Sequence, residues 1–254
     1  MPPTDASTDA DAGPAPQPAG AAEDTLDLHL PDGLLSLLAE SAPEPGPPGP
    51  GDSDGDSAAG CPAGQDLLDS PGDWAPATTA LGQFRLLPVT PERDLALLTR
   101  WMNDPAVAAF WELAGPEHVT AAHLRRQLDG DGRSVPCLGV LGRTPMSYWE
   151  IYRADLDPLA RHYPARPHDT GIHLLIGGVA DRGRGVGTTL LRAVADLVLD
   201  HRPQCPRVIA EPDLRNTPSV SAFLSAGFRF HAEVDLPDKR AALMVRDRAL
   251  RNLL

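Results

Sequence analysis

The chain has 254 residues with 35 acidic and 22 basic side chains, so its net charge at pH 7 is −13. The first 75 residues hold 15 of the acids and no Lys or Arg, which leaves the rest of the chain close to neutral. A near-neutral folded part excludes an electrostatic case for nucleic-acid binding. The sequence also has no apolar run of the ~18 residues that a membrane-spanning helix needs.

The N-terminal segment differs in composition from everything after it. Residues 1–75 contain 13 Pro and 10 Gly but only one aromatic side chain, Trp74. Such a segment buries too little apolar surface to offset the entropy of ordering. We therefore predict a disordered acidic tail over residues 1–78 and a folded domain over residues 79–254. A leucine-rich stretch at residues 26–38 is either a plain patch of that tail or a short motif that docks onto a partner or onto the domain.

The three cysteines, Cys61, Cys137 and Cys205, match neither a disulfide framework nor a zinc site in number and spacing. Unpaired thiols are typical of a reducing cytoplasm, and the chain does not open on a basic stretch followed by an apolar run. We therefore expect a soluble cytoplasmic protein that binds no metal, no membrane and no nucleic acid.

Hydrophobic periodicity predicts strands and helices from residue 84 onward. A first strand is followed by three helical segments, a hairpin, a strand, a helix, a strand, a helix and a final antiparallel pair. This order predicts an α/β fold, a mixed sheet of the α+β kind with helices on both faces. The expected ranges are 84–89, 90–102, 106–111, 120–128, 135–141, 146–152, 172–177, 188–201, 207–211, 217–226, 228–235 and 241–246.

A glycine-rich turn joins the strand at residues 172–177 to the helix that follows it. The turn reads Arg182-Gly183-Arg184-Gly185-Val186-Gly187. Glycines at the start of a helix let backbone N–H groups approach an anion at the positive end of the helix. The spacing fits neither the ATPase P-loop nor the dinucleotide fingerprint. A plain sharp turn between strand and helix is the alternative.

This turn resembles the Arg/Gln-x-x-Gly-x-Gly/Ala turn with which GNAT acyltransferases bind the pyrophosphate of coenzyme A. The order of elements over about residues 84–250 is also similar to the GNAT fold. Further motifs resemble one branch of that family, the siderophore-biosynthesis N-acyltransferases. They are Trp101-Met102-Asn103-Asp104-Pro105, Phe110-Trp111-Glu112, Tyr148-Trp149-Glu150-Ile151-Tyr152, Gly171-Ile172-His173-Leu174-Leu175-Ile176-Gly177, Glu211-Pro212-Asp213-Leu214-Arg215-Asn216 and Leu236-Pro237-Asp238-Lys239-Arg240-Ala241-Ala242-Leu243-Met244.

The resemblance implies a donor, an acceptor and a product. The donor is a coenzyme A thioester, acetyl-CoA or succinyl-CoA, or sometimes an acyl carrier protein. The acceptor is a small molecule, the N-hydroxylated side-chain amine of a lysine, cadaverine or ornithine type, and the product is a hydroxamate. No cysteine lies in these motifs to carry the acyl group, so we expect direct transfer.

Three residues are the predicted catalytic group: His173, Glu211 and Asp213. An imidazole, with its ordinary pKa of about 6.5, can take the proton of a weakly basic nitrogen, and the resemblance implies this role for His173. Glu211 and Asp213 are two residues apart at a strand end and should share a face. Glu211 matches the acid that the resemblance pairs with the histidine, and Asp213 competes with it. The alternatives are a structural buried histidine and acids that are solvated or paired with Arg215.

Two further groups are predicted around these residues. Trp111, Tyr148 and Glu150, together with His173, are the candidates for the acceptor pocket, although packing in the core is favoured for the two aromatics. Asn216 and Ser219 are expected to contact the coenzyme, with helix capping by Asn216 or Thr217 as the alternative. The complete set of expected cofactor-binding residues is Ile176, Arg182, Gly183, Arg184, Gly185, Val186, Gly187, Thr188, Asn216 and Ser219.

Three functions are compatible with the sequence. The first is an acyl-CoA-dependent N-acyltransferase that forms a hydroxamate in siderophore biosynthesis. The second is a general GNAT N-acetyltransferase that acts on a drug amine or a protein amine. The third is a non-catalytic module that binds coenzyme A, and the presence of His173, Glu211 and Asp213 argues against it.

Overall fold

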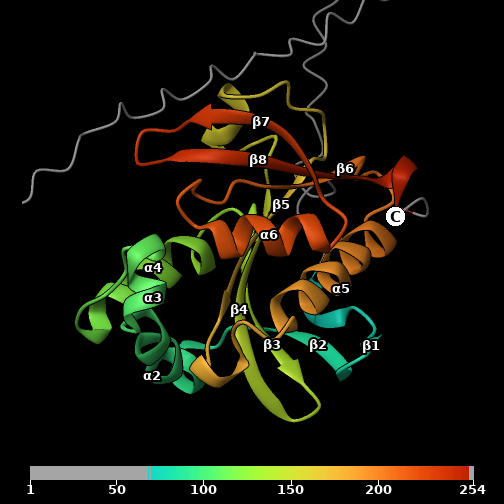
Figure 1. Ribbon diagram of the computed structural model, residues 1–254. Coiled ribbons are helices and arrows are strands. Elements are labelled where there is room, and N and C mark those ends of the chain that lie inside the picture. The colour runs from blue at the N-terminus through green and yellow to red at the C-terminus, as the bar shows by residue number, and fades with distance from the viewer. Residues whose placement is uncertain (1–67, 69, 252–254) are drawn as a thin grey trace, which may run out of the picture. The chain divides into compact units, whose positions relative to one another are not determined.

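One eight-stranded sheet organises the part of the chain that the structure, a computed structural model, describes: residue 68 and residues 70–251 (Figure 1). The strand order is β1-β2-β3-β4-β5-β6-β8-β7, and every neighbouring pair is antiparallel except β5 and β6. The strands are β1 (Ala77–Thr79), β2 (Gly82–Pro88), β3 (Ser134–Leu141), β4 (Thr144–Arg153), β5 (Thr170–Ile176), β6 (Arg207–Ala210), β7 (Arg229–Asp235) and β8 (Arg240–Asp247).

Helices cover both faces of the sheet, as the periodicity predicted. On one face, α5 and α6 pack with a core that includes Trp149 and Ile172, and on the other α2, α3 and α4 pack with a core around Tyr148 and Leu175. The helices are α2 (Pro91–Met102), α3 (Pro105–Trp111), α4 (Glu117–Leu128), α5 (Val186–His201) and α6 (Thr217–Ser225), with 3-10 turns η1 (Pro71–Asp73), η2 (Pro158–Arg161), η3 (Val179–Asp181) and η4 (Arg248–Leu250). None of the described helices is long and apolar enough to cross a membrane.

Proline and aspartate set where α3 begins. The Asp104 carboxylate accepts a hydrogen bond from the Ala106 N–H at 2.9 Å, and Pro105 occupies the first helical position, where its missing N–H costs nothing. The helix expected at residues 120–128 begins earlier, at Glu117, because Pro116 supplies an extended N-cap. The hydrophobic pattern alone does not reveal this polar first turn.

Ordered structure begins before the first strand that the sequence predicted at residue 84. The 3-10 turn at 71–73 and strand β1 precede it, and Ala77 pairs with Phe84. Trp74 is buried in the main core and stacks on the His201 ring at 5.3 Å. Three residues are too few for strand periodicity, which is why β1 was not foreseen. The stretch at 26–38 and Cys61 lie outside the described residues.

Strands β5 and β6 pair over only two residues before they separate. Thr170 pairs with Val208 and Gly171 with Ile209, whereas β5 continues to Ile176 beside β4. The opening between the two strands therefore begins one residue before His173. Such an opening leaves backbone N–H and C=O groups of both strands without a partner strand, so that they are available to a ligand.

The buried Trp74 provides a test of where the folded domain starts. Replacing Trp74 with Ala should lower the free energy of unfolding by about 3 kcal/mol, because a large aromatic side chain leaves a cavity in the core. Urea unfolding of the full chain measures this, with Leu81→Ala as an exposed control that should change little. A loss as small as that of the control would mean that Trp74 does not belong to the core.

Candidate active site

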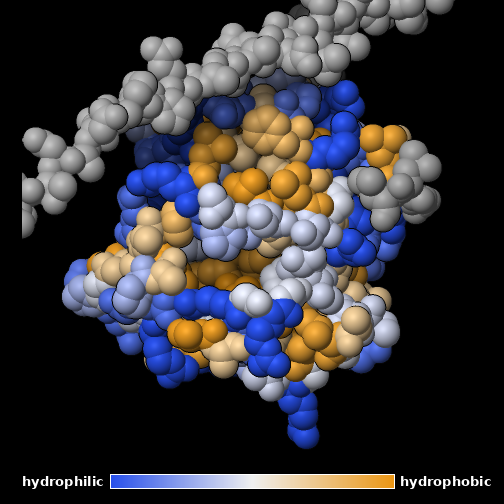
Figure 2. Space-filling view, in the orientation of Figure 1, coloured by the Kyte–Doolittle hydropathy of each residue, from blue (hydrophilic) through white to orange (hydrophobic). Residues whose placement is uncertain are grey.

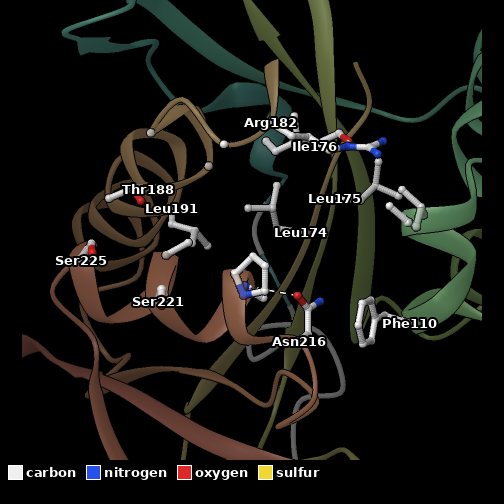
Figure 3. A pocket seen from close by; sticks show the side chains of 18 of the residues that line it. Phe110, Leu174, Leu175, Ile176, Arg182, Thr188, Leu191, Asn216, Ser221 and Ser225 are labelled. Carbon is white, nitrogen blue, oxygen red and sulfur yellow. Dashed lines mark hydrogen bonds between the residues drawn. The ribbon is translucent and has the colours of Figure 1, made fainter. Parts of the chain in front are cut away.

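A cavity of about 800 Å³ opens where β5, the glycine turn and helices α3, α5 and α6 meet (Figure 3). Figure 2 shows the corresponding hollow at the centre of this face of the molecule, with hydrophobic side chains at its floor. Of the predicted cofactor-binding residues, those that line the cavity are Ile176, Arg182, Gly183, Gly185, Gly187, Thr188, Asn216 and Ser219.

The glycine turn presents the N-terminus of α5 to this cavity. Gly183 and Gly185 have φ values of 69° and 77°, in the left-handed region that favours glycine. Gly185 is the N-cap of α5, and no described side chain caps this helix. The first N–H groups of α5 are therefore available to an anion at the positive end of the helix dipole. This arrangement fits the pyrophosphate of a coenzyme.

Arg182, the first residue of the turn, lines the cavity, but its guanidinium group bonds to the backbone and to Asp104 and so holds the turn in shape. Arg182 donates hydrogen bonds to the carbonyl groups of Ile176 at 2.9 Å and Gly177 at 3.0 Å, and its Nη1 lies 2.8 Å from Asp104 Oδ1. Arg184 and Val186 are not among the cavity-lining residues, since Arg184 turns to the Ala180 carbonyl and Val186 is buried in the core. Their contribution to coenzyme binding would have to come from their backbone groups.

Asn216 caps helix α6, which was the alternative to the predicted contact with the coenzyme. Its side-chain oxygen accepts a hydrogen bond from the Ser219 N–H at 3.2 Å, so it is the N-cap of α6 (Figure 3). Both side chains also line the cavity. Capping and ligand contact are therefore compatible at this position.

A second, smaller pocket of about 290 Å³ adjoins the first. Five residues line both: Phe110, Trp111, Leu174, Asn216 and Ser219. The smaller pocket adds polar and charged groups, among them Glu150, His173 and Glu211. A thioester that enters from the larger cavity would meet a nucleophile from the smaller one at the shared residues.

His173 lies between two carboxylates. Its Nδ1 is 2.9 Å from Glu150 Oε2, and its Nε2 contacts Glu211 Oε1. The sheet explains both contacts, because Glu150 is paired with His173 in the β4–β5 ladder and Glu211 directly follows β6 at the same level of the opening. Ionised carboxylates only accept hydrogen bonds, so both ring nitrogens must donate. His173 is therefore an imidazolium in this arrangement.

The electrostatics agree with that assignment. Burial lowers the pKa of His173, but the charge of Glu211 and the hydrogen bonds to both glutamates outweigh it and raise the pKa to about 10. Burial raises the pKa of Glu211, but the His173 cation outweighs this and lowers it to about 2. The pKa of Glu150 is likewise held well below its usual range by His123 and His173, against the effect of burial.

The two glutamates are fixed by further hydrogen bonds. Glu150 Oε1 lies 2.5 Å from His123 Nε2 and accepts from Gln127 at 2.6 Å and from the Tyr148 hydroxyl at 2.9 Å. Glu150, predicted as a wall of the acceptor pocket, is thus engaged in holding His173. Tyr148, predicted beside it, lines neither pocket, because it is fully buried against α2–α4.

The two predicted strand-end acids have different partners. Glu211 Oε2 accepts a hydrogen bond from the Tyr152 hydroxyl at 2.8 Å, and its Oε1 faces His173. Asp213 lines the pocket, but its carboxylate is paired with Arg215 at 2.6 Å and also caps the Arg215 N–H. The structure therefore brings Glu211, and not Asp213, to His173.

Four residues of this site were not singled out from the sequence: His123, Gln127, Tyr152 and Lys239. Three of them had readable signals. His123 and Gln127 are four residues apart on one face of a helix, and Tyr152 continues the alternation of Tyr148 and Glu150 along β4. Lys239 lies in one of the motifs that carry the family resemblance, but its place beside Glu211 depends on how the β7–β8 hairpin lies, which the sequence does not reveal.

Comparison with known proteins decides the family. The family model described as an acetyltransferase (GNAT) domain matches residues 90–236. The chain belongs to the GNAT acetyltransferase family. It is an acyl-CoA-dependent N-acyltransferase, and the sequence prediction of fold and enzyme class is confirmed. The co-substrate that fits its glycine turn is a coenzyme A thioester.

The chain is also similar to individual acyltransferases of known name. It is 36% identical over 170 residues to the lysine N-acyltransferase MbtK of Mycobacterium sp. (strain MCS), which covers 66% of this chain and 69% of the relative. It is 38% identical over 175 residues to an N(6)-hydroxylysine O-acetyltransferase of Escherichia coli, covering 69% of this chain and 55% of that relative. A crystal structure of aminoglycoside acetyltransferase AAC(6')-Ib with coenzyme A matches with a TM-score of 0.60 at 26% identity, over 67% of this chain and 98% of that one.

Neither described cysteine is placed to carry an acyl group. Cys137 and Cys205 are both free and buried, and burial raises the pKa of the Cys137 thiol to about 12. Within residues 70–251, no cluster of three His, Cys, Asp or Glu side chains could hold a metal ion.

The raised pKa of His173 predicts how stability depends on pH. The imidazolium stabilises the folded state fully below pH 6.5, and this contribution disappears as the pH rises towards about 10. The free energy of unfolding of the wild type, minus that of His173→Gln, should therefore shrink steadily between pH 6.5 and 10. Urea unfolding at three pH values in this range measures it. A difference that does not vary with pH would contradict the assigned imidazolium.

Proposed function

We propose that this enzyme transfers an acyl group from a coenzyme A thioester to the nitrogen of an N-hydroxylated side-chain amine of a lysine, cadaverine or ornithine type. The product is a hydroxamate for siderophore assembly. The observation that carries the proposal is the Glu150–His173–Glu211 clamp, at the junction of the coenzyme cavity and the smaller acidic pocket. The name of the N(6)-hydroxylysine O-acetyltransferase to which the chain is similar supports a hydroxylated, lysine-type acceptor, and that of the lysine N-acyltransferase supports transfer to a side-chain nitrogen.

The charge state of the clamp favours a hydroxylamine as nucleophile. A plain alkylamine is a cation near pH 7, with a pKa near that of lysine, about 10.4, and must lose a proton before it can attack. An N-hydroxylamine has a low basicity and is already neutral. The His173 imidazolium has no lone pair to offer as a strong base, whereas the ionised Glu211 can accept one proton during attack. A weak base of this kind suits a neutral nucleophile.

We infer the following division of roles, in which Glu211 replaces His173 as the first proton acceptor. The C–N bond forms as the nitrogen proton moves to Glu211. The C–S bond breaks, and the sulfur leaves as a thiol once it receives a proton. His173 can release a proton to the departing sulfur and recover one from Glu211, so the pair ends in its starting state. Ser219 lines both pockets and is a suitable group to contact the departing sulfur.

The two competing acids provide the test of these roles. Glu211→Gln should lower kcat by about 100-fold or more, since positioned general bases contribute roughly 10²- to 10⁴-fold. Asp213→Asn should lower it much less, because Asp213 is held by Arg215. Both variants should still bind coenzyme A, which calorimetry measures. A larger decrease of kcat in Asp213→Asn than in Glu211→Gln would mean that Asp213, and not Glu211, accepts the proton.

The acceptor and the acyl group are tested together. Acetyl-CoA and succinyl-CoA should be offered in competition to N-hydroxycadaverine, N6-hydroxylysine and N5-hydroxyornithine, with unhydroxylated cadaverine and lysine as matched controls. Mass spectrometry should show acylation of a hydroxylated acceptor in preference to its control, and iron(III) should give the colour of a hydroxamate. Preference for the plain amines would instead favour an acetyltransferase of the drug- or protein-amine type.

A docking role for residues 26–38 is a separate proposal about partners. It should be tested by deleting residues 1–67, because a deletion through residue 75 would also remove the buried Trp74. Loss of a partner with unchanged acyl transfer would support the docking motif. Retention of both would refute it.

A further inference from the structure

Lys239 is held beside the catalytic carboxylate by the β7–β8 hairpin. The Leu236 N–H donates to the Lys239 carbonyl at 2.8 Å, which closes the turn between the two strands. Two more backbone bonds tie β8 to the segment after Glu211, from the Ala242 N–H to the Pro212 carbonyl at 2.9 Å and from the Leu214 N–H to the Arg240 carbonyl at 3.0 Å. Lys239 Nζ lies 3.6 Å from Glu211 Oε1 as a result.

The ammonium group of Lys239 has donors to spare. It is the only lysine or arginine among the described residues that line the smaller pocket. Its distance to Glu211 is beyond a normal hydrogen bond, and Glu211 Oε1 is already engaged by His173. A lysine ammonium carries three N–H donors. The pocket therefore offers a positive hydrogen-bond donor directly beside the position where the nucleophile must lie.

We propose that Lys239 binds the hydroxyl oxygen of the N-hydroxylated acceptor and so makes N-hydroxylation a requirement for acylation. This inference rests on the proposed function. The attacking nitrogen has to approach Glu211, and its hydroxyl oxygen is one bond away. A cation 3.6 Å from the same carboxylate is within reach of that oxygen. The α-carboxylate of an amino-acid acceptor would instead lie a whole side chain away from the reacting nitrogen.

The same lysine disfavours the unhydroxylated amine. A plain amine has no oxygen to accept the hydrogen bond that the Lys239 ammonium offers beside Glu211. A site built to bond a substrate hydroxyl leaves its own polar group unpaired when that hydroxyl is missing. Lys239 therefore stabilises the bound hydroxylated acceptor and is left without a hydrogen-bond partner when the plain amine binds.

The interaction also affects which atom is acylated. A hydroxylamine has two nucleophilic atoms, nitrogen and oxygen. A hydrogen bond from Lys239 to the oxygen occupies a lone pair there and leaves the nitrogen lone pair directed at the thioester. Lys239 takes no part in the bond changes: the C–N bond forms, the C–S bond breaks and the nitrogen proton goes to Glu211, as described above.

The test compares selectivity in Lys239→Met with that in the wild type. The kcat/KM for N-hydroxycadaverine should fall by about 10- to 100-fold, the size expected for losing a hydrogen bond from a charged group, while that for cadaverine stays the same or rises. Lys239→Arg should recover part of the selectivity. The adjacent Arg240→Gln is the control, because Arg240 is mostly exposed and pairs with Glu233 outside the pocket. This control should leave the ratio unchanged.

Each other outcome has a distinct meaning. If both acceptors lose the same factor in Lys239→Met, with melting temperature and coenzyme binding unchanged, Lys239 acts only through Glu211 and the inference is overturned. Unchanged selectivity overturns it as well. If the wild type does not acylate the hydroxylated acceptor at all, it is the proposed function that fails.

Discussion

The short parallel contact between β5 and β6 is the constraint on which the rest of the structure depends. Only two residues of each strand pair before the strands separate, so the chain leaves an opening in the middle of its own sheet. His173 and Glu211 lie on either side of that opening, and the coenzyme cavity and the acceptor pocket meet beside it. Had the ladder continued, the backbone groups of the two strands would bond to each other and would not be available to a ligand.

Charge balance explains why the site can be buried there. Two carboxylates close together would normally force one of them to stay protonated, because the second charge is strongly disfavoured in a desolvated site. The imidazolium between Glu150 and Glu211 allows both to remain ionised, and His123, Gln127 and Tyr152 satisfy their remaining acceptor positions. The group thus has the character of a buried salt-bridge network, in which loss of the central cation would be more damaging than loss of any outer donor.

Local features of this protein could be predicted from its sequence, whereas features that depend on register could not. The glycine turn and its helix are contiguous in the chain, so the order of residues 182–188 was enough to predict them. The pairing of His173 with Glu211 could be proposed from the family resemblance, which left Asp213 as a competitor. The ionisation of His173 could not, since it also needs Glu150, whose position depends on the β4–β5 register. Strand β1 and the start of the core at Trp74 were missed because they lie in a composition typical of disorder.

The contact between Arg182 and Asp104 has a consequence for engineering. One carboxylate oxygen of Asp104 both caps α3 and binds the arginine that shapes the glycine turn. Helix α3 carries Phe110 and Trp111, which line both pockets. Attempts to widen the acceptor range by remodelling α3 would therefore also disturb the loop that holds the donor. Variants selected for a new acceptor would therefore need to keep Asp104. Without it, a wider acceptor range would come with a lower affinity for the acyl donor.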